Sequence, residues 1–246
     1  MKVLPLLAAV SVFTVRTLPG QSPSPTLVPP KVVDTSPKAW QTGVSAPQNV
    51  SATFDQPMSP AYTAWIGRSS VVQEVDPDSS ISPDRRTFTT KAVIQAGKVY
   101  VFSLNEKRIP RVGFQNNKGL SAPPYFLVFQ TVGNVPPDEA PPRVISTNPT
   151  NGVQTLDSAK LKSVAVTFDK PMQASKHGLH MRENGKDIDL AKARFQYSPD
   201  GKSFTLAYDF KPSSKYEFVL NSTEDIGFAS TKRIPLWPVQ FAFTTA

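Results

Sequence analysis

The stretch "SATFDQPMS" (Ser51–Ser59) has a second version, "VTFDKPMQ", at Val166–Gln173, so the chain contains Phe-Asp-x-Pro-Met twice. The residue before a proline is held extended, and proline has no N–H with which to continue a β ladder. The motif therefore predicts the end of a strand just after a buried phenylalanine. We expect the aspartate to accept a local backbone hydrogen bond in the turn. Met58 and Met172 are predicted to fill the irregular end of a hydrophobic core.

Around this motif the two halves of the chain match in order. The matching pairs are "PPKVVDTSP" at Pro29–Pro37 with "PPRVISTNP" at Pro141–Pro149, "SPDRRTF" from Ser82 with "SPDGKSF" from Ser198, Leu104-Asn105 with Leu220-Asn221, and "VFQT" ending at Thr131 with "AFTT" ending at Thr245. The offset between partners stays between 112 and 116 residues. Matches in a fixed order with small drift indicate a duplicated domain.

Each copy is predicted to be a β-sandwich. In "NVSATFD" the residues Val50, Ala52 and Phe54 share one face, and Val164, Val166 and Phe168 repeat the pattern in the second copy. Further strands are expected near Val32 and at 64–67, 71–75, 88–92, 99–104 and 126–131, and Asn184-Gly185 predicts a tight hairpin. About seven short strands in roughly 105 residues fit an immunoglobulin-like sandwich. The predicted fold is all-β: two tandem immunoglobulin-like β-sandwiches of about seven strands each, preceded by a signal peptide.

Both copies resemble the bacterial Ig-like domain of S-layer and other surface proteins, the SbsA-type Ig-like domain. The residues that carry the resemblance are Thr35-Ser36-Pro37 with Gly43-Val44, Thr147-Asn148-Pro149 with Gly152-Val153, the two Phe-Asp-x-Pro-Met motifs, the Ser-Pro-Asp turns and the closing Phe-x-Thr. It covers about 29–132 and 141–245 and implies a structural, non-enzymatic role. Members often carry an Asp and a Gly-Asn turn before the last strand, where this chain has "QNNKGL" and "EDIGFA".

The ends of the copies define the expected domain organisation. Residues 1–20 are predicted to be a signal peptide, because Lys2 is followed by an apolar run, Val3–Val15, too short to span a bilayer. We expect cleavage near Gly20, then a Pro/Ser-rich tether (21–28), the first Ig-like domain (29–132), a proline-rich linker (133–140) and the second domain (141–246). Proline-rich linkers favour extended, semi-rigid spacers, so we expect few contacts to cross between the domains.

The predicted location is outside the cytoplasm: the periplasm, the cell surface or the medium, with no integral membrane segment after cleavage. The chain has no cysteine, which excludes disulfides, thiolate metal sites, a cysteine nucleophile and a lipid anchor on cysteine.

No pattern of catalytic residues is found. His177 and His180, with Glu183 nearby, would face opposite ways on a strand and lack a third ligand. Asp55 and Asp169 occupy equivalent turns of separate domains, and no Gly-x-Ser-x-Gly sequence occurs. We therefore expect a protein without enzymatic activity, with no catalytic, cofactor-binding or metal-binding residues and no cofactor.

Two features suggest binding. The net charge is +8, and Lys-Arg-Ile-Pro occurs at 107–110 and again at 232–235, with an offset of 125 that is out of register with the rest. If both loops faced one way, they would form a basic stripe of Lys107, Arg108, Arg111, Lys232 and Arg233; ordinary solvated loop charge is the other interpretation. Trp40, Trp65 and Trp237 would either offer stacking surfaces for sugars or pack inside the sandwiches.

These observations support one leading hypothesis and two others. The first is a non-enzymatic exported envelope or surface protein that acts as a structural, adhesion or protein-interaction module, with an envelope protein or polysaccharide as partner and no role in nucleic-acid binding. The second is a protein that binds anionic envelope glycans through its basic loops. The third is an accessory module of a hydrolase, or a hydrolase whose site is not recognised.

Overall fold

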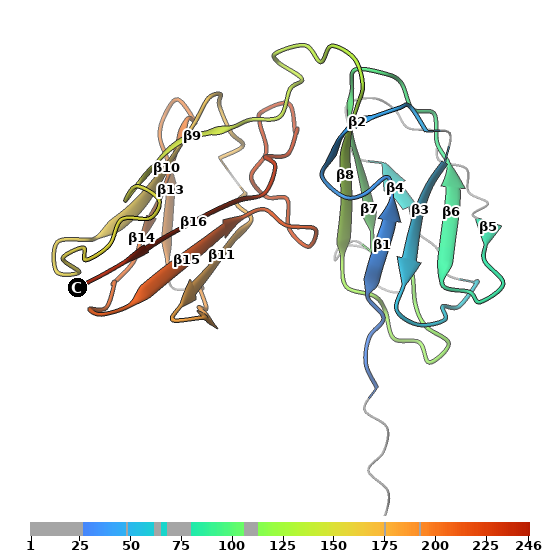
Figure 1. The fold of residues 1–246 in the computed structure, drawn as a ribbon, viewed down its shortest axis with the longest axis horizontal. Helices are drawn as coiled ribbons and strands as arrows, with labels where there is room; N and C mark the ends of the chain where they lie inside the picture. The colour runs from blue at the N-terminus through green and yellow to red at the C-terminus, as the bar shows by residue number, and fades with distance from the viewer. Residues whose placement is uncertain are drawn as a thin grey trace, which may run out of the picture.

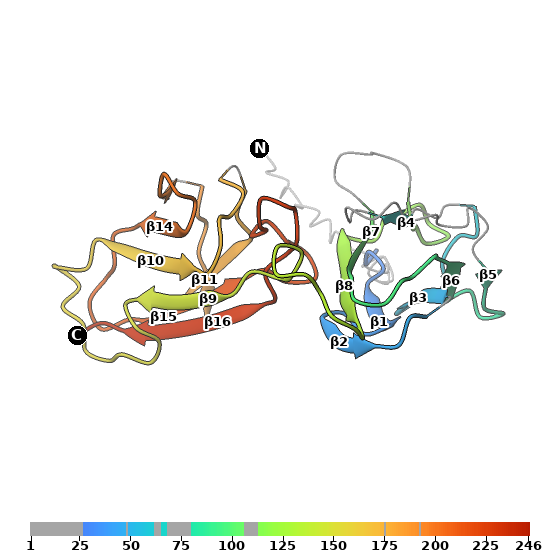
Figure 2. The same ribbon diagram turned by 90° about the horizontal axis from the view of Figure 1, so that it is seen from above.

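The computed structural model describes residues 27–47, 49–61, 65–67, 80–105, 113–174, 176–191 and 193–246. In this part of the chain the regular structure consists of β-strands, arranged as two sandwiches (Figures 1 and 2). The first contains the sheets β1-β3-β6-β5 and β2-β8-β7-β4. Its strands are β1 (Val32–Ser36), β2 (Gln41–Val44), β3 (Asn49–Phe54), β4 (Trp65–Gly67), β5 (Ser80–Ile81), β6 (Thr87–Lys91), β7 (Val99–Leu104) and β8 (Tyr125–Thr131).

The second sandwich contains the sheets β13-β14-β10-β9 and β12-β11-β15-β16. It resembles the first, except that β2 lies beside β8 in the first domain whereas β12 lies beside β11, at the opposite edge, in the second. Its strands are β9 (Val144–Asn148), β10 (Ser163–Phe168), β11 (Leu179–Glu183), β12 (Lys186–Asp187), β13 (Arg194–Tyr197), β14 (Ser203–Ala207), β15 (Lys215–Leu220) and β16 (Val239–Thr244). The all-β tandem fold expected from the sequence is confirmed, including the hairpin at Asn184-Gly185, whose residues both have positive φ. The strand expected at 71–75 lies outside the described residues.

The repeated methionine belongs to the core of each domain. Met58 and Met172 are 0% and 3% exposed, beside Phe54 and Phe168 at 1% and 0%. Both phenylalanines come from the last position of a strand, and the proline three residues on releases the chain from the ladder. The predicted core role is confirmed.

The aspartate of the motif does not bond locally as predicted. The Asp55 carboxylate accepts the N–H of Lys31 at 2.9 Å, and that of Asp169 accepts the N–H of Arg143 at 2.8 Å, partners 24 and 26 residues away. Each aspartate also donates its own N–H to the carbonyl of the same partner. The motif therefore fixes the segment that leads into the first strand of its domain.

A buried asparagine holds the hairpin before the last strand in each copy. The side-chain amide of Asn221 donates to the carbonyls of Phe228 and Leu236, both at 2.8 Å, and its oxygen accepts the N–H of Phe228 at 2.9 Å. Asn105 makes the same three bonds in the first domain, to Phe114 and Ala122. Asparagine tolerates the left-handed backbone found at both positions, φ 56° and 58°.

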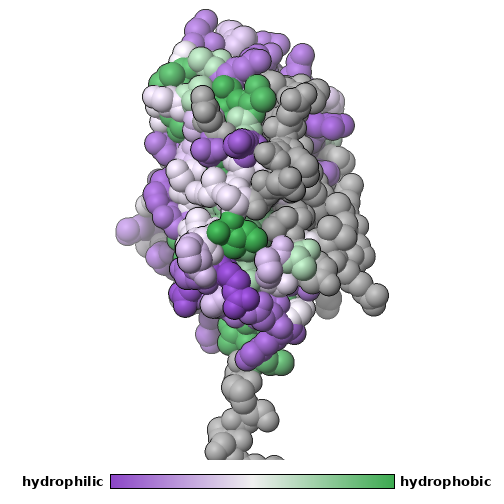
Figure 3. Space-filling view, turned by 90° about the vertical axis from the view of Figure 1, so that its right-hand side faces the viewer, coloured by the Kyte–Doolittle hydropathy of each residue, from purple (hydrophilic) through white to green (hydrophobic). Residues whose placement is uncertain are grey.

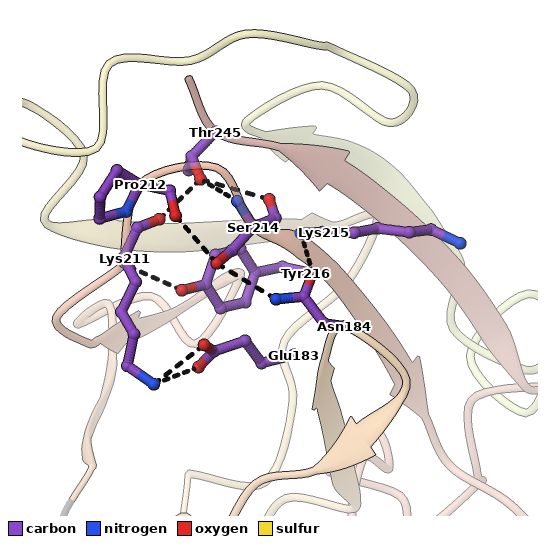
Figure 4. A network of polar contacts seen from close by, with 8 residues as sticks. All are labelled: Glu183, Asn184, Lys211, Pro212, Ser214, Lys215, Tyr216 and Thr245. Carbon is purple, nitrogen blue, oxygen red and sulfur yellow. Dashed lines mark hydrogen bonds and ion pairs between the residues drawn. The ribbon is translucent and has the colours of Figure 1, made fainter.

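The threonine of the closing Phe-x-Thr is the centre of a second repeated network, drawn for the second domain in Figure 4. Thr245 Oγ1 donates to the Lys211 carbonyl at 2.6 Å and accepts the N–H of Ser214 at 3.0 Å. The Tyr216 hydroxyl accepts the N–H of Lys211 at 2.7 Å. In the first domain Thr131, Lys98, Gln95 and Tyr100 make the corresponding bonds. The motif that closes each copy therefore has a structural role.

The hairpin held by the asparagine also shows that the two Lys-Arg-Ile-Pro sequences do not occupy equivalent positions in the two domains. Asn116 donates its N–H to Leu120, and Ser230 donates to Ile234, both at 2.9 Å, so the two hairpins correspond at an offset of 114. The second Lys-Arg-Ile-Pro is thus the counterpart of "KGLS" at 118–121, and "QNNKGL" corresponds to "ASTKRI" rather than to "EDIGFA". The first Lys-Arg-Ile-Pro lies outside the described residues.

Within the described residues, no helix has the length and apolar character needed to cross a membrane.

Candidate functional site

The most extensive contact outside the two domain cores joins the domains. β7 is buried at all six positions, whereas its counterpart β15 alternates between buried and more exposed residues. Side chains alternate between the two faces of a strand, so β7 is covered on both sides. Its outward residues Val99 and Val101 pack with Val128 of β8 against Ile234 and Trp237 of the second domain. We call this contact the joint.

The joint places the loops at one end of the second sandwich on the outer face of a sheet of the first (Figures 1 and 2). The strand registers show what the second domain carries on the same face. Lys215, Glu217 and Ala242 take the places of Val99, Val101 and Val128. The apolar outer face is therefore found in the first domain alone. An apolar face is what the first domain needs there, because the second domain packs against it.

Two tryptophans lie at the edge of the joint. The rings of Trp40 and Trp237 meet edge to face with centroids 5.6 Å apart, and the Trp237 indole N–H donates to the Trp40 carbonyl at 3.0 Å. Nearby, the N–H of Phe126 donates to the carbonyl of Thr223 at 2.6 Å. Trp65, by contrast, packs in the core of the first domain. Of the two interpretations offered by the sequence, packing inside a sandwich holds for Trp65, whereas Trp40 and Trp237 pack between the two sandwiches.

Trp40 has an unusual backbone for a bulky residue, with φ 65°. Its N–H donates to Val128, just as the N–H of Gly152 donates to Ala242, so Gly152 (φ 84°) is its counterpart. The sequence match of Gly43 with Gly152 is therefore wrong. A left-handed conformation costs a non-glycine residue about 1–2 kcal/mol. The first domain tolerates this strain at the position where the aromatic ring meets Trp237.

This strain gives a test of the role of Trp40. The variants Trp40→Gly and Trp40→Ala both remove the ring, but only alanine keeps a Cβ in the left-handed conformation. We expect the glycine variant to be more stable than the alanine variant by about 1 kcal/mol, measured by urea unfolding of the whole chain. An alanine variant as stable as the glycine variant would contradict the strained backbone.

The linker is attached to both domains. Lys98 Nζ of the first domain lies 2.6 Å from a Glu139 carboxylate oxygen, with both side chains about one-third exposed or less. Lys232 of the second domain lies 3.7 Å from Asp138, where both side chains are well exposed and the pair contributes little. The expectation that few contacts cross between the domains is wrong: linker and joint together hold the domains against each other.

The variable position of Phe-Asp-x-Pro-Met also holds the linker. Lys170 Nζ donates to the carbonyls of Pro137 at 2.7 Å and Ala140 at 2.8 Å. Gln56, at the same position of the first copy, donates to the carbonyl of Val28 at 3.2 Å. Val28 and Ala140 each precede a Pro-Pro pair. The motif therefore anchors the entry to each domain through two side chains, which explains its repetition in physical terms.

The histidines and aspartates that could serve in catalysis or metal binding are not brought together. The His177 ring packs on Phe195 with centroids 4.0 Å apart, and burial lowers the pKa of His177. Asp225 accepts the N–H of Gly227 at 2.9 Å. Asp55 and Asp169 each bond to the segment that leads into the first strand of their own domain. Among the described residues there is no cluster of three or more metal-ligating side chains.

Only part of the proposed basic stripe can be placed. Lys107, Arg108 and Arg111 lie outside the described residues. Lys232 pairs with Asp138, and the neighbouring Arg233 is exposed with φ 65°. The loop that carries them contributes Ile234 to the joint.

The side of the first domain that faces away from the second has a different surface. Figure 3 views this side, and its visible hydrophobic residues form small groups separated by hydrophilic ones. Scattered apolar side chains are normal on a protein surface. Val99, Val101 and Val128, by contrast, lie together on the face that the second domain covers.

Comparison with known structures gives distant likenesses. The methionine-rich copper resistance protein PcoC from Escherichia coli is 15% identical with a TM-score of 0.35, and the match covers 44% of this chain and 100% of PcoC. CopC from Methylosinus trichosporium OB3b is 20% identical with a TM-score of 0.30, covering 44% of this chain and 99% of CopC. The S-layer protein rSbsC(31-844) is 14% identical with a TM-score of 0.31, covering 89% of this chain and 26% of that protein.

No curated protein matches the chain by sequence. The family model described as "Bacterial Ig-like domain" matches residues 27–131 and again 138–245, nearly the whole described chain. With two such matches, one on each sandwich, the protein belongs to the bacterial Ig-like domain family.

Proposed function

We propose that this protein is a non-enzymatic structural module of a bacterial envelope or surface, exported by its N-terminal segment, that holds its attached or bound partners at a fixed geometry. Its relation to the SbsA-type domains of S-layer proteins is part of this proposal. The observation that carries it is the joint. Within a chain, relative domain motion is the default unless the interface is large and hydrophobic.

The composition of the joint supports a fixed geometry. Val99, Val101, Val128 and Ile234 are each at most 4% exposed. Separating the domains would return these side chains to water, at about 25 cal/mol for each Å² of apolar surface. The charged pair Lys98–Glu139 adds a contact that fixes the linker beside the joint. A flexible tether between two independent binding domains would need none of these features.

The proposal is tested in cells that make the native protein. Fractionation should find it in the periplasm, on the surface or in the medium without residues 1–20, and cross-linking should join it to an envelope component. The variant Val101→Lys, which places a charge in the joint, should be exported normally but lose that cross-link. Glu217→Lys, at the equivalent site of the second domain, is the matched control. A cytoplasmic pool that retains Met1 would contradict the proposal.

The same fractionated protein can distinguish the structural role from the alternative, binding of anionic glycans. Retention on an anionic envelope polysaccharide that weakens as salt rises would favour charge-driven binding. A protein that binds no polysaccharide at low salt, yet is cross-linked in the envelope, would favour the structural role.

A further inference from the structure

The second domain has a groove on its side, between the edge strands of its two sheets. It has a volume of about 460 Å³. β9 contributes Val144, Ile145 and Thr147, and Trp237, Val239 and Phe241 lie on the opposite side. Ile145 is 64% exposed, which is high for a β-branched apolar residue on a strand.

The groove is open because of one residue difference between the two copies. Val239 pairs with Leu220 as Tyr125 pairs with Leu104, so Val239 stands where the first domain has Tyr125. Tyr125 is partly buried against the core of the first domain, and its hydroxyl interacts with the side chain of Thr35. The sequence match places Thr147 at the position of Thr35. The space that a tyrosine ring fills in the first domain is therefore unfilled in the second, with the corresponding threonine in place.

The backbone beside the groove is also available. N–H groups alternate in direction along a strand. Ala242 and Thr244 of β16 direct their N–H groups to the outer edge, where they bond to Asn151 and Val153. By the same alternation, the N–H of Gln240 also points to the outer edge. In the described part of the chain, no strand pairs with Val239–Phe241 on that edge.

The first domain shows what this edge binds. Phe126 is the counterpart of Gln240, and its N–H is bonded to the carbonyl of Thr223, a residue of the other domain. This part of the sheet edge therefore already receives backbone from a second folded unit in this protein. The bond between Phe126 and Thr223 shows that this edge can bind backbone from another unit. Tyr125 shows that a tyrosine side chain fits at this position of the fold.

We propose that the groove binds an extended peptide segment of a partner protein, which adds as a strand to the edge of β16 and inserts a tyrosine side chain over Val239. In such strand addition the backbone hydrogen bonds provide affinity, and a pocket for a side chain provides specificity. The inserted hydroxyl would reach Thr147, as the hydroxyl of Tyr125 reaches Thr35. The inference is independent of where the protein resides.

The test uses the whole chain and a labelled peptide, Thr-Val-Thr-Tyr-Thr-Val-Thr, with a second peptide in which alanine replaces the tyrosine. Binding is measured by fluorescence anisotropy. We expect the alanine peptide to bind at least tenfold more weakly. The variant Val239→Tyr fills the groove with the residue found in the first domain, so it should fold normally and bind the tyrosine peptide at least tenfold more weakly than the unmodified chain. Val93→Tyr, the same substitution at an exposed site of the first domain, should bind it within about twofold.

Three results would overturn the proposal. One is a tyrosine peptide that does not bind at millimolar concentration. Another is binding that Val239→Tyr leaves unchanged while circular dichroism shows that variant to be folded. The third is binding of a proline-rich peptide or a neutral oligosaccharide in the groove with which the tyrosine peptide does not compete. Binding in the groove is recognised because the Val239→Tyr substitution abolishes it. A proline-rich occupant would point to a different binding mode, because proline cannot supply the strand hydrogen bonds.

Discussion

Replacing Asn221 with alanine is expected to destabilise the second domain by about 3–5 kcal/mol. The substitution leaves the buried N–H of Phe228 and the carbonyl of Leu236 without their partner, while the Phe228 carbonyl keeps its bond from the N–H of Leu236. Each unsatisfied buried polar group costs about 1–3 kcal/mol, partly offset where water reaches it. The hairpin at 228–236 contributes Ile234 to the joint, so the joint should weaken as well.

Urea unfolding of the whole chain measures this loss. Asn105→Ala should have an effect of similar size on the first domain, since it makes the same three bonds. Asn184→Ala, the same substitution at an exposed turn, serves as the control. It should lower the free energy of unfolding by less, because Asn184 is not buried. A loss below about 1 kcal/mol for Asn221→Ala would show that the hairpin does not depend on this side chain.

Met172→Ala is expected to destabilise its domain by about 2–5 kcal/mol, the usual cost of a buried large-to-small change. Met172 is 3% exposed and lies in the cluster that contains Phe168. Met172→Leu keeps the volume and should cost less than about 1.5 kcal/mol. Urea unfolding followed by intrinsic fluorescence measures both variants.

Because of the joint, a substitution that destabilises one domain should also lower the stability of the other. Unfolding of the second domain uncovers Val99, Val101 and Val128, so the first domain should lose part of its stability in the same transition. Met58→Ala provides the reciprocal measurement in the first domain. If either alanine costs under about 0.5 kcal/mol, the repeated motif lies outside the cooperative core.

The fold could be predicted because the signals that define it are local. Alternation in "NVSATFD", the proline that ends the strand and the Asn-Gly turn act within a few residues. The alternation and the proline occur in both copies, whereas the Asn-Gly turn at 184–185 occurs in the second copy alone. The partner of Asp55 could not be predicted in this way. Lys31 lies 24 residues earlier in the sequence and approaches only when β1 pairs with β3.

The sequence does contain a signal for the joint. "VYVFSL" at 99–104 is apolar on both faces, whereas "KYEFVL" at 215–220 alternates with charge. An uninterrupted apolar strand indicates burial on both sides. Trp40, in contrast, gave no such signal, because its left-handed backbone and its contact with Trp237 depend on how the two domains meet. The groove at Val239 likewise follows from a comparison of the two folded copies.

The central claim is that the two domains form one unit of fixed geometry. The chain has no cysteine, so single cysteines introduced at the exposed Lys91 and Lys186 can carry one spin label on each domain. Pulsed electron-resonance distance measurements should give one narrow distribution for the otherwise unmodified chain and a broad one after Val101→Lys, with Glu217→Lys leaving the narrow distribution intact. A broad distribution in the unmodified chain, unchanged by Val101→Lys, would contradict the joint and the function built on it.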